Sequence, residues 1–201
     1  SSNLDSSIED SEVFTAELIE EVKSLETDWE PAHRSTKGGF QLPNHLNIFD
    51  QKSEKIARLE NVICRELDQY YSAFGDKPCA LIDRWPKEKK LLGWHVILKR
   101  QGCQASHIHP SGWISGVVYL QVTPDLGKNE GALELSYDGE LYSHANSPRM
   151  CFSPGAGDIV LFPSSLHHRT LPFTTDTDRI VIAFDLLPSP SVLNWRGDTW
   201  S

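Results

Sequence analysis

Histidine is the residue type that points to a chemical activity in this chain. His107 and His109 are two positions apart, and His167 and His168 form a second pair further along. Residues i and i+2 of a strand point to the same face of a sheet, so His107 and His109 can direct two imidazoles at one point. A third imidazole from a distant strand would complete one face of a metal ion and leave the opposite face open to ligands. The alternative is a surface strand that carries two solvated histidines.

An arginine follows the second histidine pair and opens the last apolar segment, residues 179–184. A guanidinium group at the mouth of a β-sandwich, on the strand next to a metal-binding histidine, is well placed to bind a carboxylate through two parallel hydrogen bonds. Arg179 is therefore a candidate anion-binding residue. The alternative is a surface ion pair between Arg179 and Asp176 or Asp178.

The first third of the chain is predicted to be helical. Apolar residues recur every three or four positions within residues 11–29 and again within residues 51–74, which is typical of two amphipathic helices. Pro31, the Gly38-Gly39 pair and Gly75 interrupt the pattern. The apolar positions that carry it are Phe14, Leu18, Val22 and Leu25 in the first helix, and Ile56, Leu59, Ile63, Leu67, Tyr70 and Phe74 in the second.

Short apolar runs bounded by turn residues replace the helical period after Gly75. Many short strands at regular intervals predict a β-sandwich or barrel rather than alternating strands and helices. We therefore expect one domain over residues 1–201, with helical support at about 11–75, a β core at about 80–187 and a C-terminal tail at 188–201. The predicted strands cover residues 80–85, 91–99, 113–122, 131–137, 159–162 and 179–187.

Composition narrows the class of protein. The 201 residues include 28 acidic and 19 basic side chains, and the net charge of −9 disfavours binding to nucleic acid. No apolar run approaches the roughly 18 residues needed to cross a membrane, and no secretion signal is present. The cysteines form no CxxC pair, so a zinc ribbon is not indicated, and we expect reduced thiols in a cytoplasmic protein. These cysteines are Cys64, Cys79, Cys103 and Cys151.

The order of these elements resembles the 2-oxoglutarate/Fe(II)-dependent oxygenase superfamily over about residues 91–187. The likeness is closest to the prolyl-hydroxylase-like branch and to oxygenases with the motif HxHPxxWxSGVxYL, which residues 107–120 match. The resemblance implies a mainly β fold, a double-stranded β-helix (jelly roll) with the N-terminal helices packed on its major sheet. It also implies a dioxygenase that uses O2, Fe(II) and 2-oxoglutarate. Such an enzyme would be a hydroxylase that couples 2-oxoglutarate decarboxylation to C–H oxidation of an unknown small molecule or protein side chain. The matching residues are His107, His109, Tyr119-Leu120, Gly131-Ala132-Leu133, Gly157-Asp158, His168 and Arg179.

The resemblance implies a role for each matching histidine. His107 and His168 would bind Fe(II), with His109 as the third ligand. His168 is preferred over His167 as the distal ligand because its spacing to the arginine fits the family better, which leaves His167 beside the site or on the surface. Serine side chains or backbone carbonyls would orient the imidazoles, and Ser106 and Ser115 are the candidates.

The cosubstrate residues follow from the same likeness. Arg179 would pair with the distal carboxylate of 2-oxoglutarate, and the hydroxyl of Tyr119 would hydrogen-bond the same group. Val181 stands where some relatives carry a serine, so one hydroxyl contact is lost there, and Tyr119 or Lys99 is expected to replace it. Trp113 is expected either to line a substrate pocket or to pack in the core.

One departure from the family keeps alternatives open. The family usually has Asp or Glu where this chain has His109. Three neutral imidazoles would leave Fe(II) its full charge, and ligation by nitrogen alone also suits Zn, Ni or Cu. A cupin-like three-histidine metalloenzyme that does not use 2-oxoglutarate would share the His-x-His pair without needing Arg179. A non-catalytic jelly-roll binding module is the third possibility.

Overall fold

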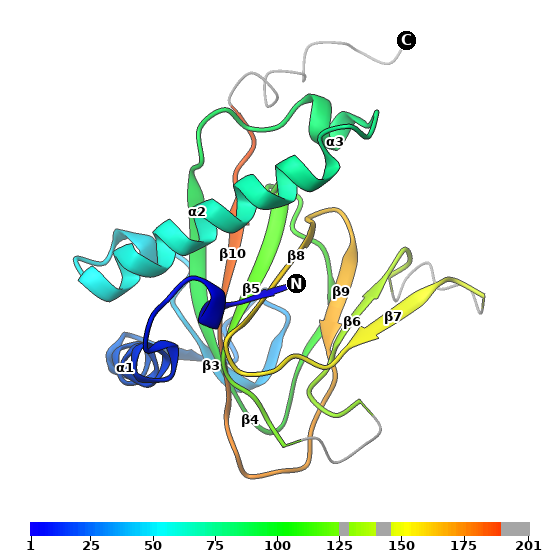
Figure 1. Cartoon of the computed structure of the whole chain (residues 1–201). Coiled ribbons are helices and arrows are strands. Elements are labelled where there is room, and N and C mark those ends of the chain that lie inside the picture. The colour runs from blue at the N-terminus through cyan, green and yellow to red at the C-terminus, as the bar shows by residue number, and fades with distance from the viewer. Residues whose placement is uncertain (125–128, 140–145, 190–201) are drawn as a thin grey trace.

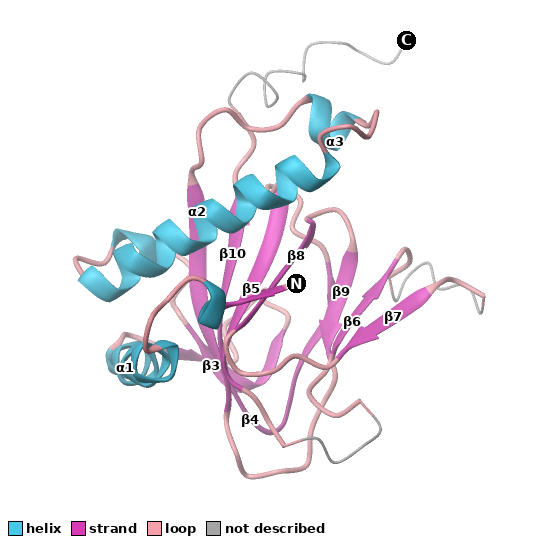
Figure 2. Ribbon diagram, viewed as in Figure 1, coloured by secondary structure: helices cyan, strands magenta, loops and turns pink. Residues whose placement is uncertain are grey.

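The computed structural model describes residues 1–124, 129–139 and 146–189, and its fold is mainly β (Figure 1). Ten strands form one curled antiparallel sheet, and the helices lie against one side of it (Figure 2). The helices are α1 (Ser11–Ser24), α2 (Glu54–Phe74) and α3 (Ala80–Asp83), with 3-10 turns at Leu4–Ser6 and Ile48–Asp50. The strands are β1 (Ser2–Asn3), β2 (Asp28–Trp29), β3 (Thr36–Gln41), β4 (Leu91–His107), β5 (Ile114–Gln121), β6 (Leu133–Ser136), β7 (Arg149–Phe152), β8 (Asp158–Pro163), β9 (His167–Thr170) and β10 (Arg179–Leu186).

Strand β4 joins the two layers of the curled sheet. The strand order is β1-β8-β5-β10-β4-β9-β6-β7. The first part of β4 pairs with β10, where Leu91 lies opposite Leu186, and its far end pairs with β9, where His107 lies opposite His168. The register shifts between Gln104 and His107, so β4 bends and leaves the major layer for the minor one. This is the double-stranded β-helix that the sequence predicts.

The central strands have one face toward the helices and one toward the interior of the roll. On β10 the apolar side chains of Ile180, Ile182 and Phe184 belong to the core shared with the helices. The alternate residues Arg179 and Val181 face the interior, because successive side chains of a strand point to opposite faces. Both faces of β10 are buried along the whole strand, which explains why its sequence reads as a continuous apolar run.

The predicted helices pack on the major sheet. Phe14, Leu18 and Val22 of α1 are buried, and α2 buries the apolar stripe predicted for it. The hydroxyl of Ser53 accepts a hydrogen bond from the backbone N–H of Ile56 at 3.3 Å, which caps the first turn of α2. The two helices thus cover the outer face of the roll and leave its interior for a site.

Two predicted elements differ from the structure. Residues 80–85 form the short helix α3 rather than a strand, since the backbone N–H groups of Ile82 and Asp83 bond to the carbonyl of Cys79. A short apolar run does not distinguish a strand from one helical turn. The first helix ends at Ser24, before the predicted residue 29, and residues 28–29 pair as β2 instead.

Other strands were not predicted. Strands β3, β7 and β9 are short or polar, so they carry no apolar alternation. The glycine pair in β3 has a packing role: a Cβ at Gly39 would lie 2.6 Å from the carbonyl oxygen of Ile97, so only glycine lets β3 approach β4 this closely.

No helix in the described part of the chain is long and apolar enough to cross a membrane. The predicted tail, residues 188–201, lies outside the described residues from 190 onward.

Candidate active site

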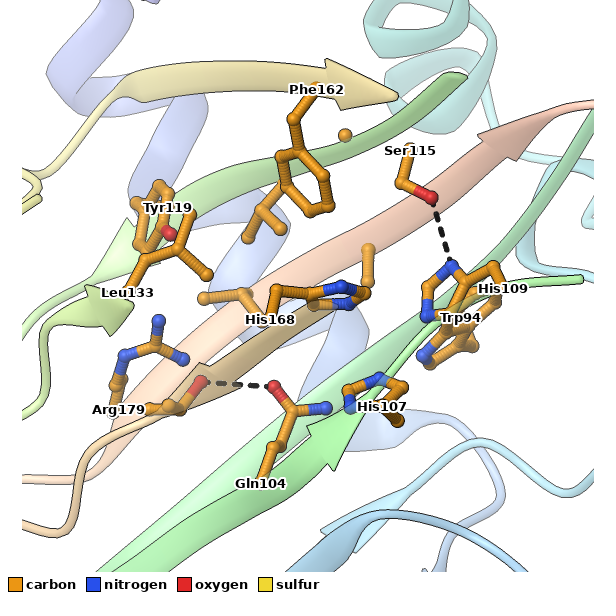
Figure 3. A pocket seen from close by; sticks show the side chains of 15 residues that line it. Trp94, Gln104, His107, His109, Ser115, Tyr119, Leu133, Phe162, His168 and Arg179 are labelled. Atoms are coloured by element: carbon orange, nitrogen blue, oxygen red, sulfur yellow. Dashed lines mark hydrogen bonds between the residues drawn. The ribbon is translucent and has the colours of Figure 1, made fainter. Parts of the chain in front are cut away.

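Three histidines meet inside the roll at the end of β4. His107 ends β4, His109 follows it in the next turn, and His168 lies on β9 directly opposite His107. One nitrogen atom from each imidazole lies within 4.8 Å of the others. The ring centroids are 4.2 Å apart for His107 and His168, 5.1 Å for His107 and His109, and 4.8 Å for His109 and His168. The three rings converge on one point (Figure 3).

Hydrogen bonds to the Nδ1 atoms orient all three rings. His107 Nδ1 donates to the carbonyl oxygen of Ala105 at 2.7 Å, and His168 Nδ1 donates to that of Leu166 at 3.0 Å. His109 Nδ1 lies 2.7 Å from a carboxylate oxygen of Asp185. Carbonyl and carboxylate oxygens only accept, so each Nδ1 carries a proton, and Nε2 is the ring nitrogen left to bind a metal. This is the tautomer that metal-binding histidines adopt when they coordinate through Nε2.

Burial keeps two of these imidazoles neutral. Together with a smaller effect of the neighbouring histidines, it lowers the pKa of His107 to about 4 and that of His168 to about 3. A neutral imidazole is the form that binds a metal, because a protonated ring has no lone pair to donate. The cluster is therefore ready to accept a cation at neutral pH without first losing protons from these two rings.

The structure places only one member of the downstream pair, His168, in the site. His168 faces the other two imidazoles and is 7% exposed. His167, one position earlier on β9, points to the opposite face, where its Nε2 would lie 2.6 Å from a Cβ added at Gly139. The alternation of a strand thus separates His168 from His167, as the sequence interpretation preferred.

The two predicted cosubstrate residues lie together deeper in the roll. Arg179 is 2% exposed, and its Cζ atom lies 5.0 Å from the centroid of the Tyr119 ring. Arg179 Nε donates to the carbonyl oxygen of Gly131 at 3.1 Å. Arg179 Nη1 and the hydroxyl of Tyr119 are buried and find no hydrogen-bond partner among residues 1–124, 129–139 and 146–189. Burial raises the pKa of the Tyr119 hydroxyl, so it remains protonated and able to donate.

A buried guanidinium group without a carboxylate partner is costly, because a charge removed from water must be compensated. Arg179 makes no ion pair with any residue that the structure describes. An anion bound between Arg179 and Tyr119 would satisfy both orphaned groups. The donors present therefore fit an anionic ligand at this end of the site and a divalent metal at the other.

One narrow pocket connects the two ends. It is lined by the three histidines, by Arg179 and Tyr119, and by apolar side chains (Figure 3). Its cavity volume is about 20 Å³, little more than one water molecule occupies, so binding of a five-carbon dianion requires the lining side chains to shift. Gln104 and Thr170, which hydrogen-bond each other at 3.1 Å, are also on its wall, as is Ser115. The apolar residues that line it include Leu133, Phe162, Val181 and Ala183.

A wider vestibule lies outside the histidines and opens to solvent. Its cavity volume is about 440 Å³, and Trp94 and the loop before β3 contribute to its wall. The guanidinium group of Arg34 lies 5.9 Å from the centroid of the Trp94 ring, within the range of a cation–π contact. The hydroxyl of Ser35 lies 3.3 Å from His107 Nε2, so this loop reaches the metal-binding atoms themselves.

Some residues of the site were missed in the sequence, and some expectations were wrong. Asp185 and Trp94 were not singled out, although Asp185 is six positions after Arg179 on one strand and period-two alternation puts both on the same face. Lys99 does not replace the lost serine contact, because it binds Asp178 at 2.6 Å instead. Trp113, by contrast, packs with the helical core, which is one of the two outcomes expected for it, and its indole N–H donates to the carbonyl oxygen of Leu81.

Of the two serines expected to orient the imidazoles, only one has a contact with a histidine. The hydroxyl of Ser115 lies 3.0 Å from His109 Nδ1. No hydrogen bond joins Ser106 to the three imidazoles in the described part of the chain.

Fold and site together are those of a jelly roll with a cluster of three histidines that could hold one metal ion inside the roll. Residues 93–185 match the model of a family described as "Putative 2OG-Fe(II) oxygenase". The β core of the chain is thus similar to the 2-oxoglutarate/Fe(II)-dependent oxygenases, which confirms the resemblance seen in the sequence. The protein is an enzyme of this kind, and Fe(II) and 2-oxoglutarate are its cofactors. No curated protein matches the sequence.

Three solved structures share the fold. A prolyl-4-hydroxylase from Pseudomonas putida superposes with a TM-score of 0.58 at 15% identity, covering 89% of this chain and 88% of that one. HygX from Streptomyces hygroscopicus, with nickel and 2-oxoglutarate bound, gives 0.57 at 14% identity and covers 89% and 80%. A prolyl hydroxylase from Trichoplax adhaerens, in complex with a hypoxia inducible factor peptide, gives 0.60 at 14% identity and covers 93% and 83%. At such identities the likeness establishes the double-stranded β-helix.

Proposed function

We propose that this protein is a hydroxylase in which His107, His109 and His168 hold Fe(II) and Arg179 and Tyr119 hold 2-oxoglutarate. The observation that carries the proposal is the pocket itself, which has three converging imidazole rings at one end and, at the other, a buried guanidinium group that forms no ion pair with any described residue and whose Nη1 has no hydrogen-bond partner among them. When bound, Fe(II) and 2-oxoglutarate together activate O2, and the 2-oxo acid is oxidised to succinate and CO2 as the substrate C–H bond is hydroxylated.

The protein's own contribution is to position and shield these groups. With Nδ1 held by a hydrogen bond in each ring, the three histidines would hold the cation through Nε2 and leave room for further ligands. Arg179 and Tyr119 would each donate hydrogen bonds to the distal carboxylate of 2-oxoglutarate, and the buried setting strengthens these charge-assisted bonds. Phe162 and Leu133 exclude water from the space between the two ends.

We infer that the organic substrate reaches the metal through the outer vestibule. The vestibule is lined by His107 and His109 but not by Arg179, and it has the room that the inner pocket lacks. Trp94 offers an aromatic face and Arg34 a cation at its rim. A target with a flat apolar part and an acidic group would complement this rim. A small molecule and a protein side chain both meet this description.

The direct test is turnover of 2-oxoglutarate by the iron-loaded protein under air. We expect succinate to form and O2 to be consumed, with binding of 2-oxoglutarate to the Ni(II)-loaded protein measured in parallel by calorimetry. Binding of 2-oxoglutarate that needs the metal and Arg179 would support the proposal. A metal-loaded protein that is indifferent to 2-oxoglutarate would instead indicate the cupin-like alternative and would refute the proposal.

A further inference from the structure

A buried carboxylate lies directly behind one of the three imidazoles. Asp185, on the inner face near the end of β10, is 5% exposed. Its Oδ1 atom accepts a hydrogen bond from His109 Nδ1 at 2.7 Å and a second from the hydroxyl of Ser115 at 2.6 Å. The Ser115 hydroxyl also lies 2.9 Å from that of Ser164. Asp185 is therefore held by a hydrogen-bond network whose central contact is with His109.

The chain packs tightly over this carboxylate. A Cβ added at Gly112 would lie 3.0 Å from Asp185 Cγ and 2.6 Å from the hydroxyl oxygen of Ser164. The turn after His109 thus closes directly onto Asp185, and glycine is the residue that lets it do so. A carboxylate enclosed in this way interacts strongly with nearby charge, because little water remains to screen it.

His109 differs from the other two histidines in this respect. The Nδ1 atoms of His107 and His168 are bound by neutral backbone carbonyls, whereas that of His109 is bound by a charged group. His109 is also the position at which the family usually has an acidic ligand. Of the three imidazoles, the one that replaces a carboxylate has a carboxylate of its own behind it.

We propose that Asp185 is a positioning residue of the metal centre. It orients His109, and from behind this imidazole it supplies the negative charge that a carboxylate ligand would otherwise bring to the site. This inference rests on the proposed metal-binding role of the three histidines. A carboxylate that accepts the Nδ1 proton fixes the ring and makes Nε2 a stronger donor. Three neutral ligands backed by one buried charge then lower the net charge of the occupied site from +2 to +1.

The test is the affinity for Ni(II), measured by competition with a chelator, in wild type and in three variants. Asp185→Asn removes the charge but can still accept the Nδ1 proton. Asp185→Glu keeps the charge and displaces it by one methylene. Glu66→Gln is the matched control, because Glu66 is also a buried carboxylate but lies on α2, on the helix side of the sheet. His107→Ala, which lacks a ligand, defines the complete loss of binding.

We expect Asp185→Asn to bind Ni(II) about 10- to 100-fold more weakly than wild type. Asp185→Glu should recover part of this loss, and Glu66→Gln should bind like wild type. The visible spectrum of the Co(II)-loaded Asp185→Asn protein should also change, since the donor strength of His109 changes. Affinity within threefold of wild type and an unchanged Co(II) spectrum in Asp185→Asn would overturn the inference.

A measurement on the wild type keeps the inference testable if Asp185→Asn does not fold. In the Zn(II)-loaded protein, a nitrogen-15 spectrum should show His109 protonated at Nδ1, with a strongly downfield, slowly exchanging proton. A His109 that is metal-bound at Nδ1, or whose Nδ1 proton exchanges freely with water, would contradict the inference. If the wild type itself does not bind Ni(II), the proposed function is refuted. If the wild type binds Ni(II) and Asp185→Asn binds it equally well, only the role of Asp185 is refuted.

Discussion

The imidazole rings of His107 and His168 lie against each other across the β4–β9 pair, with their centroids 4.2 Å apart and their planes tilted by 48°. The bend in β4 brings this about, because it takes the strand from the layer that contains β10 to the layer that contains β9. The metal-binding end of the site is therefore built where the two layers of the roll are joined. Its geometry depends on the sheet rather than on a flexible loop.

Replacing a metal-binding histidine should remove the stabilisation that a metal provides. We expect Ni(II) to raise the melting temperature of the wild type, since a ligand that binds only the folded state stabilises it. His107→Ala and His168→Ala should abolish this rise. Thermal unfolding with and without Ni(II) measures it.

His167→Ala is the matched control for this series, because His167 neighbours His168 in sequence but faces away from the site. It should keep the full rise in melting temperature. Loss of the rise in His167→Ala together with its retention in His168→Ala would reassign the distal ligand.

Removing the guanidinium group should weaken the binding of 2-oxoglutarate without affecting the metal. For Arg179→Met we expect a loss of about 1.5–3 kcal/mol, the usual contribution of a hydrogen bond to a charged group. Tyr119→Phe should cost less, about 0.5–1.5 kcal/mol, because it removes one neutral donor. Calorimetry on the Ni(II)-loaded proteins measures both.

Lys99→Met provides the comparison for charge removal, since Lys99 binds Asp178 rather than the pocket. Its affinity for 2-oxoglutarate should equal that of the wild type. If Lys99→Met and Arg179→Met weakened binding equally, the effect would arise from overall charge and not from a specific contact.

Stability should fall in mild acid because of a histidine on the other face of the sheet. His95 is fully buried, and neither ring nitrogen has a hydrogen-bond partner in the described part of the protein. Burial lowers its pKa from the usual 6.5 to about 4. Between these two values the unfolded chain binds a proton that the folded protein does not, so the free energy of unfolding decreases as the pH falls. The slope from this one group is at most about 1.4 kcal/mol per pH unit.

His95→Leu should reduce the slope of the unfolding free energy against pH by the contribution of this one histidine. It should not destabilise the protein at neutral pH, since it removes an unsatisfied polar group. Urea unfolding at pH 7.5 and pH 5 measures both effects. His45→Leu is the control, because His45 is exposed and should leave the profile unchanged. A slope that is the same in His95→Leu and wild type would contradict the assignment.

One glycine is required for the packing of the central strands. A Cβ at Gly116 on β5 would lie 2.1 Å from the ring of Phe184 on β10. Gly116→Ala must therefore displace a fully buried aromatic ring, and we expect a loss of about 1–3 kcal/mol in the free energy of unfolding. Gly155→Ala, where the nearest atom lies at 3.6 Å, should change stability little in the same urea titration.

The sequence by itself determined the class of fold and the chemical types at the site. The His-x-His spacing has one consequence in an extended chain, which is that both rings face the same way. Arg179 and Tyr119 were likewise predictable, since their strands are marked by apolar runs and by the family motif. Such features are local, so they can be seen in a single stretch of chain.

Only the tertiary structure decided which side chains meet. The short polar strand β9, which carries His168, has no apolar alternation of its own and is identified by its pairing with β4. Asp185 acquires its role from a contact with His109, a residue on a different segment of the roll. Contacts of this kind depend on strand register and on the bend of β4, which arise from the packing of the whole sheet and not from any local pattern of residues.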